Sequence, residues 1–504
     1  MTLHVTNTLS GDKEPFEPQD PESVLLYYCG LTVSDDPHLG HARAWVHVDA
    51  MHRWLAHLGY NVRHVENFTD VNEKIVARIG EHGDSEREVA RHFIGRTIEA
   101  MRSLNLLRAE VYPRVSEHVP EIIALIERLV ERGYAYEANG SVYFDVSSFE
   151  EYGALSNQRI EDIEAQSEDA EPGEKRHPAD FALWKAGAVS PEDVNQHRHE
   201  GLDPIDAPSG QCWNSPWGEG RPGWHVECSA MSMTHLDESI DLHVGGQDLV
   251  FPHHENEIAQ SEAATGKRFA NYWLHVRLLE TEGEKMSSSL KNFFTVHHAV
   301  EEYGANVIRM FLLSTSYSSK QTYSETALTE ARERWERLER GYERAVEAVD
   351  SPDARTRVED EALRSAVSDA RESFTAGMND DFNTREALAA LLAIATAVNR
   401  HVDARVEPSA SRSERDDRSG YDYRGLRRAV ETFEELGEDV LGFSFVAETE
   451  GIVTVADELA ALILELRERE RDAGNFDRAD ELRADLEALG VTVEDTDEGP
   501  VARF

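Results

Sequence analysis

The chain has 504 residues and carries 97 acidic against 51 basic side chains, which gives a formal net charge of −46. Its length excludes a single compact core, the lack of an apolar run of about 18 residues excludes a membrane-spanning helix, and three cysteines are too few for a disulfide framework. Acidic residues lie in every segment, and only eight of the basic residues are lysine, a pattern that indicates adaptation to high salt. At about 1 M salt the Debye length is about 3 Å, so the repulsion between this chain and a nucleic acid is largely screened. The negative charge therefore does not exclude a nucleic acid partner.

The first elements in chain order predict a βαβ unit. Residues 24–33 are apolar and aromatic, as in a buried strand, apolar residues then recur at helical spacing from 45 to 58, and residues 61–68 read as a second strand. A strand, a helix and a strand within about 45 residues predict a parallel sheet. The N-terminus lacks a charged-then-apolar leader, so we expect a cytosolic protein.

The remaining elements predict several further structural parts. Residues 85–133 read as helical, and a hairpin is expected around Asn139-Gly140. Two polar stretches, 160–176 and 194–211, interrupt the pattern as exposed loops would, and patterned sequence resumes at residue 213. Residues 326–404 are mostly helical, 405–421 read as a linker, and the chain ends in a helical stripe at 476–489 and a small strand pair at 491–493 and 501–504.

His38-Leu39-Gly40-His41 is the first candidate site, between the predicted strand and helix. A helix N-terminus presents unpaired N–H groups and the positive end of the helix dipole, both of which suit a phosphate. The two imidazoles lie three residues apart, on one face, and Gly40 leaves room for a ligand. Taken alone, the motif fits surface histidines at a helix cap equally well.

Lys285-Met286-Ser287-Ser288-Ser289 is the second candidate site, in a loop after a predicted strand at 275–280. A lysine in a chain that otherwise uses arginine indicates a point charge for a phosphate. The alternative is a flexible polar loop.

The two motifs together resemble the HIGH and KMSKS signatures of the class I aminoacyl-tRNA synthetases. The resemblance implies that His38, Gly40, His41, Lys285, Met286 and Ser287 bind ATP. It also implies that His38, His41 and Lys285 stabilise the departing pyrophosphate, which is catalysis by positioning and electrostatics. Ser288 stands where the family has its second lysine, and Lys291 is a candidate replacement.

Cys29, Cys228, His253 and Glu257 form a candidate metal site. His253 and Glu257 lie four residues apart on a predicted helix, so their side chains converge. Thiolates, an imidazole and a carboxylate suit zinc. The spacing leaves two alternatives open, namely ligation by the neighbouring His254 or Glu255, and simple packing of Cys228 in a core.

Longer segments resemble the cysteinyl-tRNA synthetases within that class: YCGLTV at 28–33, GRPGWHVECSAM at 220–231, FPHHENEIAQ at 251–260, and three shorter motifs at 180–185, 292–295 and 380–384. The resemblance implies that Cys29, Cys228, His253 and Glu257 hold one zinc ion. It further implies that Thr69 contacts the substrate cysteine, as Cys29 does through the metal, that Trp224 packs on the substrate and that Asp248 holds its ammonium group.

The implied fold is α/β, with a Rossmann-like catalytic domain split by an insertion. The two halves of this domain are residues 1–112 and 213–325, and the connective insertion between them is 113–212. The helical bundle follows at 326–404. A linker at 405–421 then leads to the C-terminal tRNA-reading α/β module at 422–504. The implied partners are L-cysteine, ATP with Mg²⁺, and tRNA(Cys), and we expect a monomer. Two alternatives are a ligase that couples cysteine to a small amine, which would need no tRNA-reading region, and a non-catalytic zinc- or RNA-binding paralogue, which Ser288 alone favours.

Overall fold

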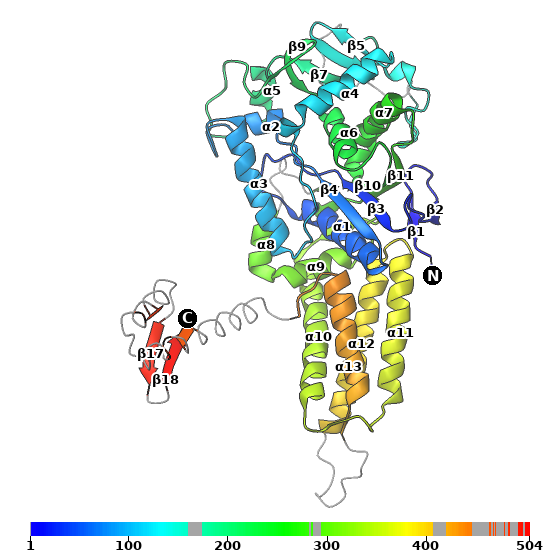
Figure 1. Cartoon of the computed structure of the whole chain (residues 1–504), viewed down its shortest axis with the longest axis vertical. Coiled ribbons are helices and arrows are strands. Elements are labelled where there is room, and N and C mark those ends of the chain that lie inside the picture. Colours follow the sequence, from blue (N-terminus) through cyan, green and yellow to red (C-terminus); the bar gives the residue numbers. More distant parts are fainter. Residues whose placement is uncertain are drawn as a thin grey trace, which may run out of the picture. The chain divides into compact units, whose positions relative to one another are not determined.

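The computed structural model describes residues 2–159, 174–281, 284–285, 294–406 and 420–445 (Figure 1). Beyond them it describes 463–464, 467, 469, 478, 482–483, 492–496 and 499–503. The chain forms two compact units, Met1–Phe443 and Ser444–Phe504, and each is described by itself.

The centre of the first unit is a four-stranded parallel sheet in the order β11-β10-β3-β4, which confirms the predicted fold class. Helix α1 connects β3 to β4 on one side, and β10 leads through α7 to β11 on the other. The two middle strands, β3 and β10, therefore form a topological switch point, where α/β sheets bind ligands at the carboxyl ends of their strands. The bounds are β3 Ser23–Tyr28, α1 Leu39–His57, β4 Asn61–Glu66, β10 Ile240–Gly246, α7 Glu255–Thr265 and β11 Ala270–Val276.

Strand β3 is shorter than predicted: it ends at Tyr28, whereas the apolar pattern extends to Val33. Beyond it the chain continues beside the segment that follows β4: Thr69 N–H donates to Leu31 O at 3.2 Å, and Val33 N–H donates to Thr69 O at 3.1 Å. The apolar pattern continues past the strand because this turn is also packed inside the protein. Cys29 thus lies just beyond the strand's carboxyl end.

An antiparallel sheet in the order β5-β6-β7-β9-β8 forms the insertion (Figure 1). The hairpin predicted around Asn139-Gly140 is present as β5 and β6. The last two strands lie beyond residue 212, where we expected the insertion to end. The bounds are β5 Ala135–Ala138, β6 Ser141–Phe144, β7 Phe181–Ala186, β8 Trp213–Ser215 and β9 Gly218–Pro222, with helices α4 Val119–Glu131, α5 Pro191–Gln196 and α6 Trp224–His235. Of the predicted loop at 160–176, residues 160–173 lie outside the described residues.

Four helices form the bundle, at the opposite end of the first unit from the insertion (Figure 1). Helix α13 continues into the wider turns of η7, and both pack against the other helices, although we had expected residues from 422 onward in the C-terminal module. The buried residues of α10, such as Leu328, Trp335 and Leu338, recur at helical spacing. The bounds are α10 Glu325–Asp350, α11 Glu361–Asn379, α12 Thr384–Val406, α13 Tyr423–Thr432 and η7 Phe433–Val440.

Shorter elements complete the described structure. The region predicted as helical from 85 to 133 contains α3 Glu86–Ser103 and α4, separated by irregular chain and the short helical turn η1 Val115–Glu117. The others are β1 His4–Thr6, β2 Lys13–Pro15, α2 Glu73–Val76, β12 Leu279–Thr281, β13 Glu284–Lys285, α8 Val296–Tyr303, α9 Ala305–Leu313, β14 Gln321–Tyr323, β15 Ala354–Arg355 and β16 Tyr421–Asp422. In the second unit, β17 Thr492–Thr496 and β18 Gly499–Arg503 form the predicted antiparallel pair. No helix in the described part of the chain is long and apolar enough to cross a membrane.

Buried charges join α1 to the start of the bundle. Arg309 of α9 is fully buried, and its guanidinium donates to Asp49 Oδ2 at 2.6 Å and to the carbonyls of Leu104 and Leu441 at 2.9 Å each. Asp49 also accepts a hydrogen bond from Arg53 at 2.9 Å. Because each charge has several partners, the pair tolerates burial that an isolated charge would not.

Glu66, the last residue of β4, is buried in a different way. Burial raises its pKa to about 8, because the one polar contact that opposes the shift is a hydrogen bond of 2.9 Å from Trp45 Nε1 on α1. The carboxyl group is therefore protonated in the folded chain at neutral pH.

We expect Asp49→Ala to lower the free energy of unfolding by about 3–5 kcal/mol, because it leaves the buried Arg309 without its counter-charge. Urea denaturation at constant salt, followed by tryptophan fluorescence, measures the change. The control is Lys13→Ala, which removes the exposed ion pair with Asp380 and should cost less than about 1 kcal/mol. Equal losses in the two variants would contradict the role given to the buried pair.

We expect Glu66→Gln to become increasingly stabilising as the pH rises. In the unfolded chain Glu66 ionises near pH 4.5, so between pH 4.5 and about 8 the folded state binds the additional proton and the wild-type free energy of unfolding falls. Glutamine accepts the same hydrogen bond but cannot ionise. The stability difference between variant and wild type should grow by up to about 1.4 kcal/mol per pH unit in this window and level off above it. Denaturation curves at fixed salt test this, and a difference that does not vary with pH would refute it.

Candidate active site and metal centre

The HLGH motif begins α1, as predicted. His38 is the N-cap residue: its Nδ1 accepts from Gly40 N–H at 3.0 Å, while His38 N–H donates to Nδ1 of His41 at 3.3 Å. The two rings stack with centroids 3.8 Å apart. A Cβ on Gly40 would come within 2.7 Å of the His38 ring, so glycine is needed for this cap.

The segment that follows the KMSSS loop pairs with the HLGH segment. Leu39 N–H donates to Phe294 O at 3.0 Å, and Val296 N–H donates to Pro37 O at 2.9 Å. Lys285 lies on β13, with its side chain outside the described part, and Met286, Ser287, Ser288 and Lys291 lie outside the described residues. The chain leaving one motif is thus held against the start of the other.

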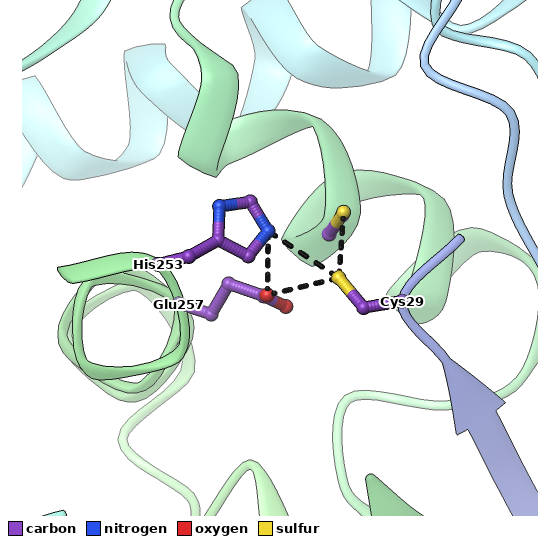
Figure 2. Close-up of side chains that lie close together, drawn as sticks. Cys29, His253 and Glu257 are labelled. Atoms are coloured by element: carbon purple, nitrogen blue, oxygen red, sulfur yellow. Dashed lines mark hydrogen bonds and ion pairs between the residues drawn. The ribbon is translucent and has the colours of Figure 1, made fainter. Parts of the chain in front are cut away.

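The four predicted metal ligands come together from three separate segments. Their ligand atoms all lie within 4.8 Å of one another, and all four side chains are buried. Cys29 Sγ is 3.2 Å from Cys228 Sγ, 3.3 Å from His253 Nε2 and 3.6 Å from Glu257 Oε1. Figure 2 shows Cys29, His253 and Glu257 pointing toward one another, Cys29 from the end of β3 and the other two from the helical segment around α7.

Two further histidines hold the outer sides of these ligands. Nδ1 of His225, on α6 one turn before Cys228, lies 2.9 Å from Nδ1 of His253. Nε2 of His243, on β10, lies 2.9 Å from Glu257 Oε2. Because ligands of bound metals are usually fixed by such outer hydrogen bonds, this arrangement is typical of a metal site.

Of the two neighbouring residues considered as alternative ligands, Glu255 points away from the cluster, whereas His254 remains a potential ligand. Glu255 accepts from the backbone of Gly153 at 2.9 Å and of Ser156 at 2.8 Å. His254 Nδ1 lies 2.8 Å from Nε2 of His275, although His254 also lies near His243 and Glu257 in a second buried group of potential ligands.

The buried charges prepare the cluster for a cation. The hydrogen bond from Cys29 lowers the pKa of the Cys228 thiol to about 6. Burial alone would raise the pKa of Glu257, but the neighbouring His243 and His253 outweigh it and bring the pKa to about 2. Burial likewise opposes a charge on His253, yet the Cys228 thiolate and Glu257 raise its pKa to about 10. A thiolate and a carboxylate are thus held together beside a protonated imidazole, and a metal ion can displace that proton.

The distances in the cluster also fit a metal ion. Ligand atoms at about 2.0–2.3 Å from a tetrahedral zinc ion lie about 3.3–3.8 Å from one another. The contacts of Cys29 given above, and the 3.1 Å between His253 Nε2 and Glu257 Oε1, are close to this spacing. Two sulfurs, a nitrogen and an oxygen form a ligand set that favours zinc over magnesium or calcium.

Of the three predicted substrate residues, Trp224 lies directly beside this cluster. Trp224 is the first residue of α6, 39% exposed, with its ring centroid 4.4 Å from that of His253. Thr69 follows β4, and its hydroxyl accepts a hydrogen bond of 3.3 Å from Asn67. Asp248 lies in η4 Gln247–Leu249, directly after β10. All three follow, or face, the carboxyl ends of the sheet strands.

Sequence reasoning did not single out Asn67, His225 or His243. His225 could have been recognised from its position one helical turn before Cys228. His243 had a weaker signal, a polar ring within a buried strand. Asn67 had none, because its importance depends on tertiary contacts.

The comparisons with known proteins agree with this geometry. Residues 15–333 match the family model for the class I (C) tRNA synthetase catalytic domain, and residues 373–446 match a DALR domain. The chain is 68% identical to the cysteine–tRNA ligase of Haloarcula marismortui and 63% identical to that of Halobacterium salinarum, over the whole of each chain. It is 42% identical to the cysteine–tRNA ligase of Thermococcus gammatolerans, over 99% of both chains.

Solved structures show the same fold at low identity. A Mycobacterium tuberculosis methionyl-tRNA synthetase bound by methionyl-adenylate has a TM-score of 0.60 at 14% identity, over 83% of this chain and 94% of that one. A Campylobacter jejuni structure described as a putative arginyl-tRNA synthetase has a TM-score of 0.54 at 14% identity, over 83% and 93%. With the full-length identities above, these matches establish that the chain belongs to the cysteine–tRNA ligase family of class I aminoacyl-tRNA synthetases.

Proposed function

We propose that this chain activates L-cysteine with ATP and transfers the cysteinyl group to the 3′ end of tRNA(Cys). The observation that carries the proposal is the buried cluster of Cys29, Cys228, His253 and Glu257 at the switch point of the sheet. It lies at the carboxyl ends of the strands, on the same side as the helix N-terminus formed by HLGH. A thiol-binding group and a phosphate-binding group therefore face one site.

In the first step, a carboxylate oxygen of cysteine attacks the α-phosphorus of ATP. The bond from that phosphorus to the bridging oxygen of the β-phosphate breaks, and pyrophosphate leaves with Mg²⁺. The N-terminus of α1, with His38 and His41, and the loop with Lys285, Met286 and Ser287 bind the phosphates and stabilise the charge that develops on the leaving group. The pairing of Phe294 and Val296 with the HLGH segment supports this shared role.

We propose that the cluster holds zinc. A zinc ion bound there would take the thiolate of the substrate, which serine cannot supply. This selectivity is needed because a small difference in side-chain size gives only about 10- to 200-fold discrimination. Around it, Trp224 packs on the substrate, Asp248 pairs with its ammonium group and Thr69 contacts its polar end.

In the second step, the terminal 2′-hydroxyl of the tRNA attacks the carbonyl carbon of cysteinyl-adenylate, and AMP leaves as the hydroxyl loses its proton. The bundle and the DALR match at 373–446 support a macromolecular acceptor rather than a small amine. We propose a monomer as the active form.

Cysteine-dependent exchange between ATP and pyrophosphate, in molar KCl, tests the activation step. We expect exchange with cysteine, none with serine, and loss after treatment with a chelator, with recovery on adding zinc. Exchange without transfer to tRNA(Cys) would favour a ligase acting on a small amine. No exchange from folded, zinc-loaded protein would leave the non-catalytic paralogue as the better interpretation.

Replacement of single cysteines tests the metal centre. We expect Cys228→Ser to lose bound zinc, measured by elemental analysis, and to lower the exchange rate by more than about a hundredfold, since even partners of metal ligands are worth about 10- to 100-fold. Cys212→Ser is the matched control. Cys212 is the third cysteine of the chain and lies outside the cluster, so this variant should keep both zinc and activity. Full zinc content in Cys228→Ser would overturn the assignment.

A further inference from the structure

Arg43 is a fully buried arginine of α1, two residues after the HLGH motif. Its Nε donates to Arg277 O at 2.9 Å. Its Nη2 donates to the carbonyls of Ser316 at 2.9 Å and Ser319 at 2.6 Å, and its Nη1 donates to the side-chain oxygen of Gln321. A guanidinium can hold acceptors in several directions at once, which the single ammonium group of a lysine cannot do with the same geometry.

The charge of Arg43 is buried without a counter-charge. Among the described residues no carboxylate forms an ion pair with it, and burial lowers its pKa to about 10. The guanidinium therefore stays charged at neutral pH, held by four neutral carbonyl oxygens. Arg309, another fully buried arginine, has Asp49 as its counter-charge. Because burying an unbalanced charge costs stability, the position of Arg43 indicates a role beyond packing.

All four acceptors border the small sheet that carries Lys285. Arg277 precedes β12 by two residues, Gln321 is the first residue of β14, and the two serines lie in the loop before it. Strand β12 pairs with β14 on one side and with β13 on the other, where Glu280 lies opposite Lys285. One side chain of α1 thus binds the chain at the start of both strands that support β13.

Gln321 makes this connection directional. Arg43 can only donate, so the amide oxygen of Gln321 faces it, and the NH₂ group donates to Phe311 O at 2.6 Å. Both ends of the amide are therefore used, one toward α1 and one toward α9. The start of β14 is held between these two helices.

The KMSSS motif is consequently bound to α1 on both sides. Before the motif, Arg43 holds the chain at Arg277. After it, Phe294 and Val296 form backbone hydrogen bonds with the HLGH segment. The chain that leads to the motif and the chain that returns from it are both tied to the first turns of one helix.

We propose that Arg43 is a positioning residue for the activation of ATP, which sets the strand of Lys285 relative to the HLGH helix. This rests on the proposed function. Arg43 acts through Lys285 and does not itself contact ATP. The two motifs stabilise charge on the same leaving group, so their relative placement controls the rate, and a shift of about 1 Å can cost about a hundredfold.

A double-variant cycle between Arg43→Lys and Lys285→Ala tests this. The rate of cysteinyl-adenylate formation is measured in single turnovers of the zinc-loaded full-length chain in molar KCl. Arg43→Lys keeps the charge but loses the fork, and we expect it to lower the rate by about a hundredfold. Zinc content and the calorimetric dissociation constant of cysteine should not change. In the Lys285→Ala background the same substitution should cost less than about threefold, because the lysine that it positions is absent.

Arg309→Lys is the matched control. Arg309 is also fully buried and also binds backbone carbonyls, but its partners lie at Asp49, Leu104 and Leu441, away from the sheet of Lys285. We expect this variant to lower the free energy of unfolding. Any effect on the rate should be the same with and without Lys285.

Gln321→Ala provides a milder second cycle, because it removes one of the four acceptors and leaves the three backbone carbonyls. We expect about a tenfold loss of rate with Lys285 present and no further loss in its absence. This cycle decides the question if Arg43→Lys does not retain zinc. Losses that multiply with that of Lys285→Ala would overturn the proposal in favour of a general structural role. A wild-type chain that forms no adenylate would overturn the proposed function itself, and this inference with it.

Discussion

The pairing of β3 between β10 and β4 is the constraint on which the site depends. All three strands are parallel, so their carboxyl ends meet at one edge, and Cys29 N–H still donates to Val244 O at 3.0 Å just beyond the end of β3. This places a thiol from residue 29 next to one from residue 228, on a helix that enters from the insertion. Without that register the four ligand atoms would have no common position.

Histidines complete the environment that the strands create. His243, on the middle strand β10, contacts Glu257, and His225 of α6 contacts His253. His253 and Glu257 are thus each held by a hydrogen bond on the side that faces away from the cluster. The HLGH segment is likewise fixed, by backbone hydrogen bonds between residues 37–39 and residues 294–296, which follow the KMSSS motif. A displacement of either segment would disturb the other.

The large negative charge of the chain is a property of its surface and not of these sites. Inside the first unit some of the buried charged groups are paired, as in Arg309 with Asp49, and others are neutralised by protonation, as in Glu66. High salt screens exposed charges but affects buried pairs much less. An acidic surface and an ordinary catalytic interior are therefore compatible in one chain, and a polyanionic tRNA is compatible with both.

The sequence by itself determined the local elements and identified most of the candidate site residues. The βαβ pattern, the hairpin at 139–140 and the cap at His38 depend on short-range spacing, which is visible in one dimension, and long motifs such as GRPGWHVECSAM allowed the family to be recognised. Tertiary structure decided the rest. It ended β3 at Tyr28 while the apolar pattern continued, and placed residues 422–440 in the bundle. It also showed that Glu255 is held by the backbone of residues 153 and 156, away from the cluster that contains His253 and Glu257. The environment of Asn67 depended on it most, because its contacts are with residues that only folding brings together: Gly30, Cys228 and the hydroxyl of Thr69.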